Sequence, residues 1–201
     1  KLASSPTKAV DVGLKNTIVS FSKETSGLFS FEYKTVLKDE ETENENIYVL
    51  GSVGPCLSKG TVLTSENTDK INENYKTQLQ ALKDGGVDGI IFETYHNLEE
   101  LFIATKIAKS LDLPVIAMLA CKKEGETLDG LNIKTAIKKL DENADIDAIG
   151  LNCVIGPHAM LSIVEKVINL SEKPFVVEPN AGHPQNIDGR MIYMSTPEYF
   201  T

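Results

Sequence analysis

Short apolar runs recur along the chain and indicate buried strands. They lie at residues 47–51, 89–93, 114–119, 148–152 and 174–178, and each ends in small or polar residues. Runs of this length without alternating polar positions are typical of parallel strands whose faces are covered by helices. The pattern therefore predicts five buried, parallel strands.

Segments with helical periodicity lie between these runs. Apolar residues three and four positions apart place one face of each segment in the core. We predict helices over residues 8–23, 71–82, 98–111 and 157–170. Asn97 and Glu100 resemble a capping box at the start of the third of these helices, and Gly85-Gly86 predicts the end of the second.

The stretch from Phe29 to Asn46 interrupts this alternation. Its second half contains an acidic cluster over residues 39–45, which cannot bury its charges. We therefore expect a solvated, mobile loop here.

Alternating strands and helices form either a doubly wound open sheet or a (β/α)8 barrel. A complete barrel needs eight strands and about 250 residues. The chain has 201 residues and five predicted strands, so a barrel would be incomplete. We expect a single domain over residues 1–201.

Composition narrows the classes of function. Hydrophobic residues make up 41% of the chain and charged residues 24%, which suits a globular domain with a sizeable core. A formal net charge of -9 would repel nucleic-acid phosphates. No apolar run is long enough to span a bilayer, and the chain does not open on a signal peptide. We expect a cytoplasmic protein with three reduced cysteines and no nucleic-acid or membrane partner.

The residues that follow the apolar runs are the first place to look for chemistry, because both architectures bind ligands at the carboxyl ends of their strands. None of these segments has the glycine pattern of a nucleotide site. They read Gly51-Ser-Val-Gly-Pro55, Glu93-Thr94, Cys121, Asn152-Cys153 and Pro179-Asn-Ala-Gly182.

Four motifs at these strand ends carry a family resemblance. They resemble, in order and spacing, the homocysteine-binding domain of homocysteine S-methyltransferases, and the resemblance covers most of the chain. The motifs are Gly51-Ser-Val-Gly-Pro55, Phe92-Glu-Thr94, Gly150-Leu-Asn-Cys-Val-Ile-Gly-Pro157 and Pro179-Asn-Ala-Gly182. The resemblance implies a (β/α)8 barrel of which about strands 3 to 7 are present, with the first two strands and the last strand absent. Some members of the family are fused to a methylenetetrahydrofolate reductase domain or to folate and cobalamin modules, and this chain would fit any of them.

The resemblance also implies a zinc centre. In the family, the cysteine of a Gly-x-Asn-Cys run binds zinc, and Cys153 is the matching residue. An adjacent Cys-Cys pair on the last strand supplies two further thiolates, and the substrate takes the fourth position. This sequence ends at Thr201 without such a pair, so we expect the zinc site to be incomplete in this chain. Zinc would deprotonate the homocysteine sulfur, which attacks a methyl group only as a thiolate.

Two substrate-binding residues follow from the same comparison. Glu93 matches a glutamate suited to bind the ammonium group of homocysteine, and Asn152 matches the asparagine beside the metal ligand. Cys56 and Cys121 match no functional position, so we expect them to be structural. No catalytic base is implied, because metal coordination removes the thiol proton.

The leading hypothesis is therefore methyl transfer from a donor to zinc-activated homocysteine, giving methionine. The donor would be a methylfolate, S-methylmethionine or a betaine. Two alternatives remain open at this point. One is a catalytically inactive fragment or binding module of such a barrel, and the other is an unrelated α/β enzyme that binds a small anion.

Overall fold

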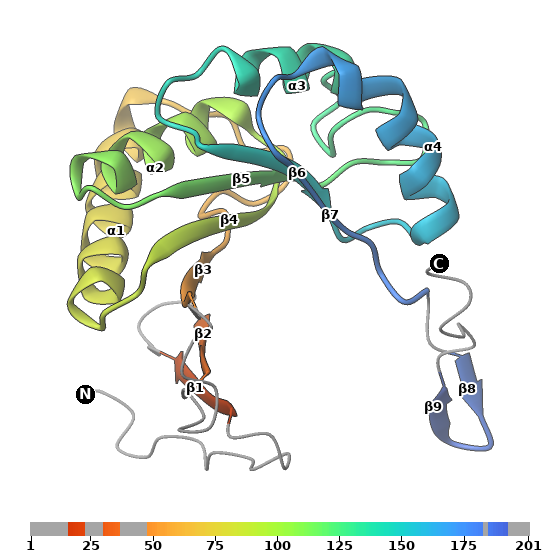
Figure 1. Cartoon of the computed structure of the whole chain (residues 1–201), viewed down its shortest axis with the longest axis horizontal. Coiled ribbons are helices and arrows are strands. Elements are labelled where there is room, and N and C mark those ends of the chain that lie inside the picture. Colours follow the sequence, from red (N-terminus) through yellow and green to blue (C-terminus); the bar gives the residue numbers. More distant parts are fainter. Residues whose placement is uncertain (1–15, 23–29, 37–47, 183–184, 193–201) are drawn as a thin grey trace, which may run out of the picture.

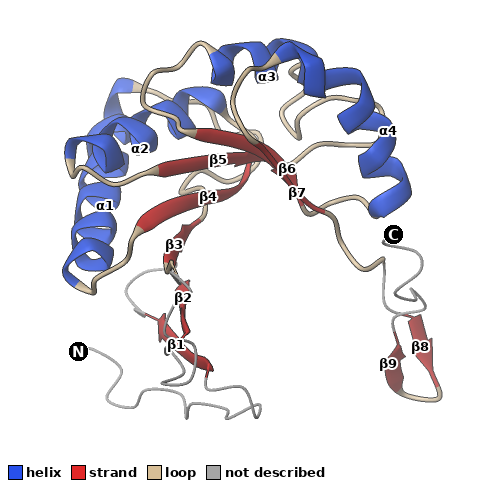
Figure 2. Cartoon of the chain, in the orientation of Figure 1, coloured by secondary structure: helices blue, strands red, loops and turns tan. Residues whose placement is uncertain are grey.

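A curved sheet with helices on its convex side forms the centre of the molecule (Figures 1 and 2). The computed structural model describes residues 16–22, 30–36, 48–182 and 185–192. Five strands of the sheet are parallel and neighbour one another in chain order. They are β3 (Leu50–Val53), β4 (Gly89–Tyr95), β5 (Val115–Leu119), β6 (Ala148–Asn152) and β7 (Phe175–Glu178).

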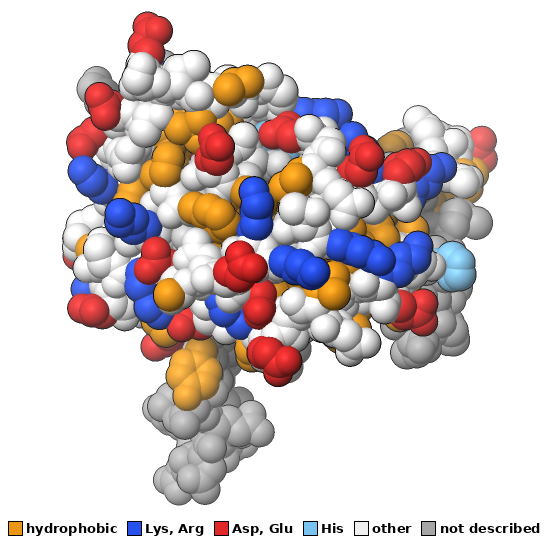
Figure 3. Space-filling view, turned by 90° about the horizontal axis from the view of Figure 1, so that it is seen from above, with side chains coloured by type: hydrophobic (Ala, Val, Ile, Leu, Met, Phe, Trp, Pro, Cys, Tyr) orange, Lys and Arg blue, Asp and Glu red, His pale blue; other side chains and the backbone are white. Residues whose placement is uncertain are grey.

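Four α-helices connect these five strands, one between each strand and the next. They are α1 (Ser65–Asp84), α2 (Leu98–Ser110), α3 (Ile133–Asp141) and α4 (Pro157–Val167), and a 3-10 turn, η1 (Ile168–Leu170), follows α4. The helices bury their apolar stripes against the sheet and leave charged side chains of both signs on the outer surface (Figure 3). Within the described segments, no helix combines the length and the hydropathy needed to cross a membrane.

The strand and helix order agrees with the sequence prediction over most of the parallel region. The expected strand at 47–51 is shifted, because β3 occupies Leu50–Val53. Helix α3 was not predicted from its sequence, although its four buried residues recur at helical spacing. The short hairpin of β8 (Gln185–Ile187) and β9 (Arg190–Ile192) was also missed.

The prediction for the N-terminal region is wrong where the structure describes it. Residues 16–22 form strand β1 (Asn16–Ser22) instead of the expected helix, and β2 (Ser30–Val36) lies in the expected loop. β-branched and aromatic residues favour strands in both segments, and the antiparallel β1–β2 ladder pairs their backbones. Residues 8–15 and the acidic cluster 39–45 lie outside the described residues.

The helix caps are partly as predicted. Gly85 caps α1, and Gly86 adopts a left-handed φ of 84°, as expected of a helix terminator. The Asn97 side chain accepts a hydrogen bond from the Glu100 N–H at 3.0 Å. The prediction of a full capping box is wrong, because the Glu100 carboxylate accepts hydrogen bonds from other segments instead of from the Asn97 N–H.

Gly150 determines how closely β6 and β7 approach. A Cβ at this position would lie 2.3 Å from the carbonyl oxygen of Val176, a backbone atom that cannot rotate away. We expect Gly150→Ala to lower the free energy of unfolding by about 1–3 kcal/mol, measured as a lower denaturant midpoint. Gly54→Ala is the matched control, because a Cβ there meets nothing within 4 Å. Equal midpoints for the two variants would contradict this packing.

Candidate functional site at the carboxyl edge of the sheet

The two faces of the parallel sheet have different environments. Alternate residues, such as Phe92, Ala117 and Leu151, belong to the core shared with the helices. The intervening residues lie on the opposite, concave face, because successive side chains of a strand point to opposite sides. At the carboxyl ends of β4, β6 and β7 these residues are Glu93, Asn152 and Glu178.

Strand β4 ends in an irregularity at Glu93 and Thr94. The pairing register with β5 shifts between Phe92 and Tyr95, and Thr94 has a φ of 63°. A left-handed conformation is strained in a β-branched residue, and bulges of this kind often redirect side chains beside functional sites. The two residues that the sequence singles out at this strand end therefore lie in a specialised piece of backbone.

Strand β6 ends in a second strained segment, at Cys153 and Val154. Their φ values are 56° and 63°, and the Ile155 N–H donates to the Cys153 carbonyl at 2.7 Å. A three-residue turn with a positive φ at its centre is rare and strained. The Cys153 N–H also donates to the Glu178 carbonyl at 2.9 Å, which ties the turn to β7. Strain at a cysteine on the ligand-binding edge of a sheet points to a functional position.

Asn152 connects these two strand ends. Its Oδ1 accepts from the Thr94 N–H at 2.8 Å, and its Nδ2 donates to Thr94 Oγ1 at 3.0 Å and to Cys153 Sγ at 3.4 Å. The side chain is only 1% exposed. The Asn152 side chain thus contacts its chain neighbour Cys153 and joins both residues to Thr94, the residue that follows Glu93.

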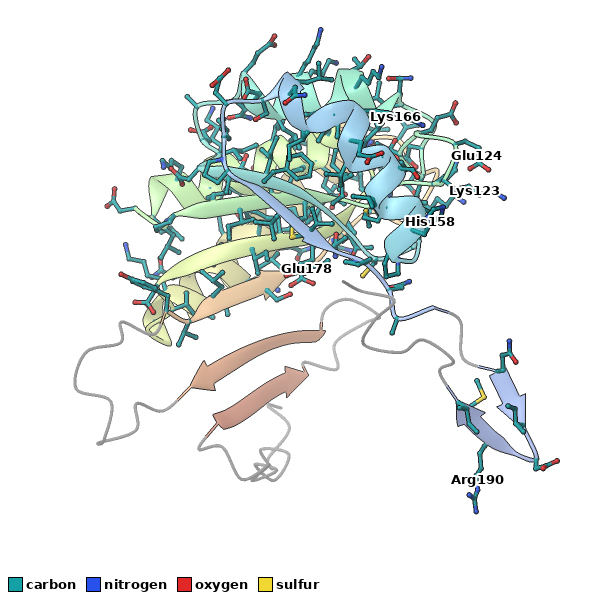
Figure 4. All side chains as sticks on the ribbon, turned by 45° about the vertical axis from the view of Figure 1, so that its right-hand side comes forward. Lys123, Glu124, His158, Lys166, Glu178 and Arg190 are labelled. Carbon is teal, nitrogen blue, oxygen red and sulfur yellow. The ribbon has the colours of Figure 1, made fainter. Side chains whose placement is uncertain are left out.

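Glu93 and Glu178 are two carboxylates on the concave face. Burial raises the pKa of Glu178, and the negative charge of Glu93 raises it further. Glu178 lies on the side of the sheet away from the helices (Figure 4). Glu178 was not among the residues predicted from the sequence, although it ends the apolar run 174–178 as Glu93 ends the run 89–93. Their electrostatic coupling indicates an environment suited to a cationic group of a ligand.

Cys56 lies in a buried polar network beside α1 and α2. Glu100 Oε1 accepts from Tyr75 Oη at 2.7 Å and from the N–H groups of Cys56 and Leu57 at 2.5 and 3.0 Å. Tyr95 Oη lies 2.8 Å from Tyr75 Oη. Glu100 is fully buried, and its Oε2 has no hydrogen-bond partner among the described residues. The network fixes the loop after β3 through the backbone of Cys56, and the structural role of its thiol stays a prediction.

The three cysteines differ in their expected reactivity. Burial raises the pKa of Cys56 to about 12 and that of Cys121 to about 11. Since a thiol reacts as its thiolate, we expect both groups to react slowly with alkylating reagents at pH 8. In full-length protein stripped of metal by a chelator, we expect iodoacetamide to modify half-buried Cys153 first, as read by peptide mass spectrometry. Equal labelling of Cys56 and Cys153 would contradict this order.

One side chain at this edge has the chemistry to bind a metal ion. A cysteine at a strand end suits zinc chemically. Within the described ranges, however, no three His, Cys, Asp or Glu side chains are grouped closely enough to hold a metal ion. His158 is exposed at the start of α4 and lies outside the network around Asn152 (Figure 4), and His183 lies outside the described residues. In the described part of the chain, Cys153 is therefore a half-buried cysteine at a strand end with no complete set of metal-binding side chains around it.

The fold is that of an α/β protein, and its candidate site lies where the parallel strands end. A profile of the homocysteine S-methyltransferase family matches residues 24–201. The chain belongs to the homocysteine S-methyltransferase family. This membership confirms the resemblance carried by the strand-end motifs and sets aside an unrelated α/β enzyme.

Individual relatives give the same result. Methionine synthase of Mycobacterium tuberculosis is 32% identical over 143 residues, which are 68% of this chain and 12% of that protein. Homocysteine S-methyltransferase 1 of Arabidopsis thaliana is 27% identical over 140 residues, or 66% of this chain and 43% of that protein. This chain thus spans less than half of either relative.

A solved structure supports the fold. The apo form of the homocysteine methyltransferase MmuM from Escherichia coli matches with a TM-score of 0.58 and 23% identity. The match covers 68% of this chain and 50% of that one. At this level of identity, the likeness concerns the arrangement of strands and helices.

Proposed function

We propose that the protein carrying this chain transfers a methyl group to the sulfur of homocysteine, giving methionine. Family membership supports the reaction class. The observation that carries the proposal is the joining of Cys153 to the Glu93–Thr94 strand end through Asn152. This arrangement places a sulfur ligand and a carboxylate at one edge of the sheet. Homocysteine has a thiol at one end and an ammonium group at the other, so it needs both kinds of group.

We propose that Cys153 is one of the thiolates that hold a zinc ion, with the remaining ligands supplied from outside the described residues. Zinc would bind the homocysteine sulfur and keep it deprotonated at neutral pH. Cys153 would contribute its sulfur from a turn that the backbone bonds to Ile155 and Glu178 hold in place. The main demand on the rest of the site is then alignment of the substrate with the methyl donor.

The Glu93 carboxylate is proposed to bind the ammonium group of homocysteine. The Glu93 carboxylate makes no hydrogen bond or ion pair with another described residue, so its oxygens are available to a ligand. Below this edge, Ile91 and Met118 are buried on the same face of the sheet and would keep water from the aliphatic part of the substrate. Asn152, which the family resemblance makes a candidate substrate ligand, has its amide occupied by protein partners and would act through Cys153.

We further propose that the five parallel strands are part of a (β/α)8 barrel. The curvature of the sheet supports this proposal (Figure 1). In the described region, β7 pairs only with β6, which leaves its other edge available to a further strand. The concave face would then become the inside of the barrel, with the candidate site at its carboxyl end.

The reaction is tested with the full-length protein, zinc and isotopically labelled homocysteine. Methylfolate, S-methylmethionine and betaine are supplied in separate reactions, and labelled methionine is measured by mass spectrometry. We expect methionine with one of the three donors, and loss of the product after a chelator removes the zinc. No methionine with any donor would overturn the proposed function.

Glu93→Gln tests the carboxylate directly. The amide keeps the shape of the side chain but loses a charge-assisted bond, so we expect the KM for homocysteine to rise about 10- to 100-fold. The value of kcat should change less, because the carboxylate binds the ammonium group in the enzyme–substrate complex as well as in the transition state. Glu124→Gln, at an exposed position of another loop (Figure 4), is the control and should leave both constants unchanged. An unchanged KM in Glu93→Gln would remove Glu93 from the site.

A further inference from the structure

The Asn152 side chain directs its oxygen and both of its N–H donors at protein partners. An asparagine amide offers one acceptor oxygen and two N–H donors. In this chain the oxygen accepts from the Thr94 N–H, while the two donors point to Thr94 Oγ1 and Cys153 Sγ. With 1% of the side chain exposed, little of the amide is left for a ligand. Asn152 is therefore suited to connecting segments of the protein and not to binding a ligand.

The connection spans two strands that are not neighbours. Strand β5 lies between β4 and β6 in the sheet, so no backbone ladder links the ends of β4 and β6. The N–H that Asn152 binds belongs to the peptide between Glu93 and Thr94. On the other side, Asn152 is covalently next to Cys153. One amide thus fixes the backbone of the candidate ammonium ligand relative to the candidate metal ligand.

Thr94 carries strain that this connection offsets. A φ of 63° is a strained conformation for a β-branched residue. Two hydrogen bonds to Asn152, one from its backbone and one to its hydroxyl, hold Thr94 in this conformation. Without the hydroxyl contact, Asn152 would lose one of the two bonds that orient its amide toward Cys153.

We propose that Thr94 and Asn152 are positioning residues that set the separation between the Glu93 carboxylate and the Cys153 sulfur, and so select thiols that also carry an ammonium group. The assignment rests on the proposed function and extends it to substrate specificity. Neither residue touches the reacting atoms. They act by fixing the spacing between the carboxylate that would bind the ammonium group and the thiolate that would hold the zinc.

The test measures selectivity in the zinc-loaded, full-length protein. Two thiols are titrated by calorimetry: homocysteine, and 4-mercaptobutanoic acid, which lacks only the ammonium group. We expect the wild-type protein to prefer homocysteine by about 30-fold, as one charge-assisted bond allows. Thr94→Val, which removes the hydroxyl and keeps the β-branch, should reduce this preference below about 5-fold with unchanged affinity for the analogue. Thr94→Ser keeps the hydroxyl and should keep the preference.

Other results would overturn the assignment. A Thr94→Val protein that retains the full preference, or that loses affinity for both thiols equally, would show that Thr94 is merely structural. If Thr94→Val does not fold, Thr94→Ala removes the same hydroxyl and is judged by the same criterion. A wild-type protein that binds neither thiol and forms no methionine would overturn the proposed function and this assignment with it. If only the positioning role of Thr94 and Asn152 is wrong, the wild-type protein still forms methionine.

Discussion

Replacing Cys153 with serine in the full-length protein is expected to lower zinc-dependent methionine formation by at least about 10³-fold. The reason is that serine removes a soft thiolate ligand and offers a hydroxyl that stays protonated and binds zinc poorly. Homocysteine sulfur would then remain a protonated thiol at neutral pH, which is a weak nucleophile. Methionine is quantified by mass spectrometry, and zinc per chain is measured in parallel by elemental analysis.

Cys56→Ser is the matched control for this prediction. Cys56 is also half-buried near the carboxyl edge, but its backbone N–H bonds to the Tyr75–Glu100 network away from the Asn152 connection. We expect this variant to keep its zinc and to retain activity within a few-fold of wild type. Full activity in Cys153→Ser, or an equal loss in both variants, would contradict the role assigned to Cys153.

Glu100→Ala is expected to lower the free energy of unfolding by about 3–5 kcal/mol. It would remove the acceptor of the Tyr75 hydroxyl and of the Leu57 N–H, and would leave the Cys56 N–H only its longer bond to Tyr75 Oη at 3.2 Å. The site is buried, so water cannot easily replace the carboxylate. Glu100→Gln keeps an acceptor oxygen and should lose less. The measurement is the urea midpoint at an unchanged slope.

Glu99 provides the control for this stability prediction. It precedes Glu100 in the first turn of α2 and is exposed. Glu99→Ala should cost no more than about 0.5 kcal/mol, the usual contribution of an acidic residue near a helix N-terminus. If Glu99→Ala and Glu100→Ala had the same midpoint, the buried network would not stabilise the loop after β3.

The parallel strands and most helices could be predicted because their hydrophobic pattern is local. The run 148–152 coincides with β6, and Ile71, Tyr75, Leu79 and Leu82 are all buried on α1. Strand β1 was mistaken for a helix because a strand depends on pairing with a partner, and its antiparallel partner β2, which begins at Ser30, was itself predicted to be a loop. Nothing in a periodicity argument reveals a partner of this kind, and β-propensity alone is a weak guide.

The candidate site was predictable in its residue types but not in its connections. Apolar runs that end in Glu93 and Asn152-Cys153 already place these residues at the ligand-binding edge. Glu178 carries the same signal and was overlooked. The bonds from Asn152 to Thr94 depend on a bulge and on a left-handed φ, which side-chain spacing does not encode. The burial of Glu100 likewise depends on a loop distant in sequence.

Cys153 is proposed to help hold a zinc ion that binds the homocysteine sulfur. The most direct measurement is zinc X-ray absorption on the full-length, zinc-loaded protein before and after homocysteine is added. We predict one additional sulfur ligand at about 2.3 Å when homocysteine binds, and one sulfur fewer in Cys153→Ser. Zinc coordination that stays the same on addition of homocysteine, or in the Cys153 variant, would contradict the account.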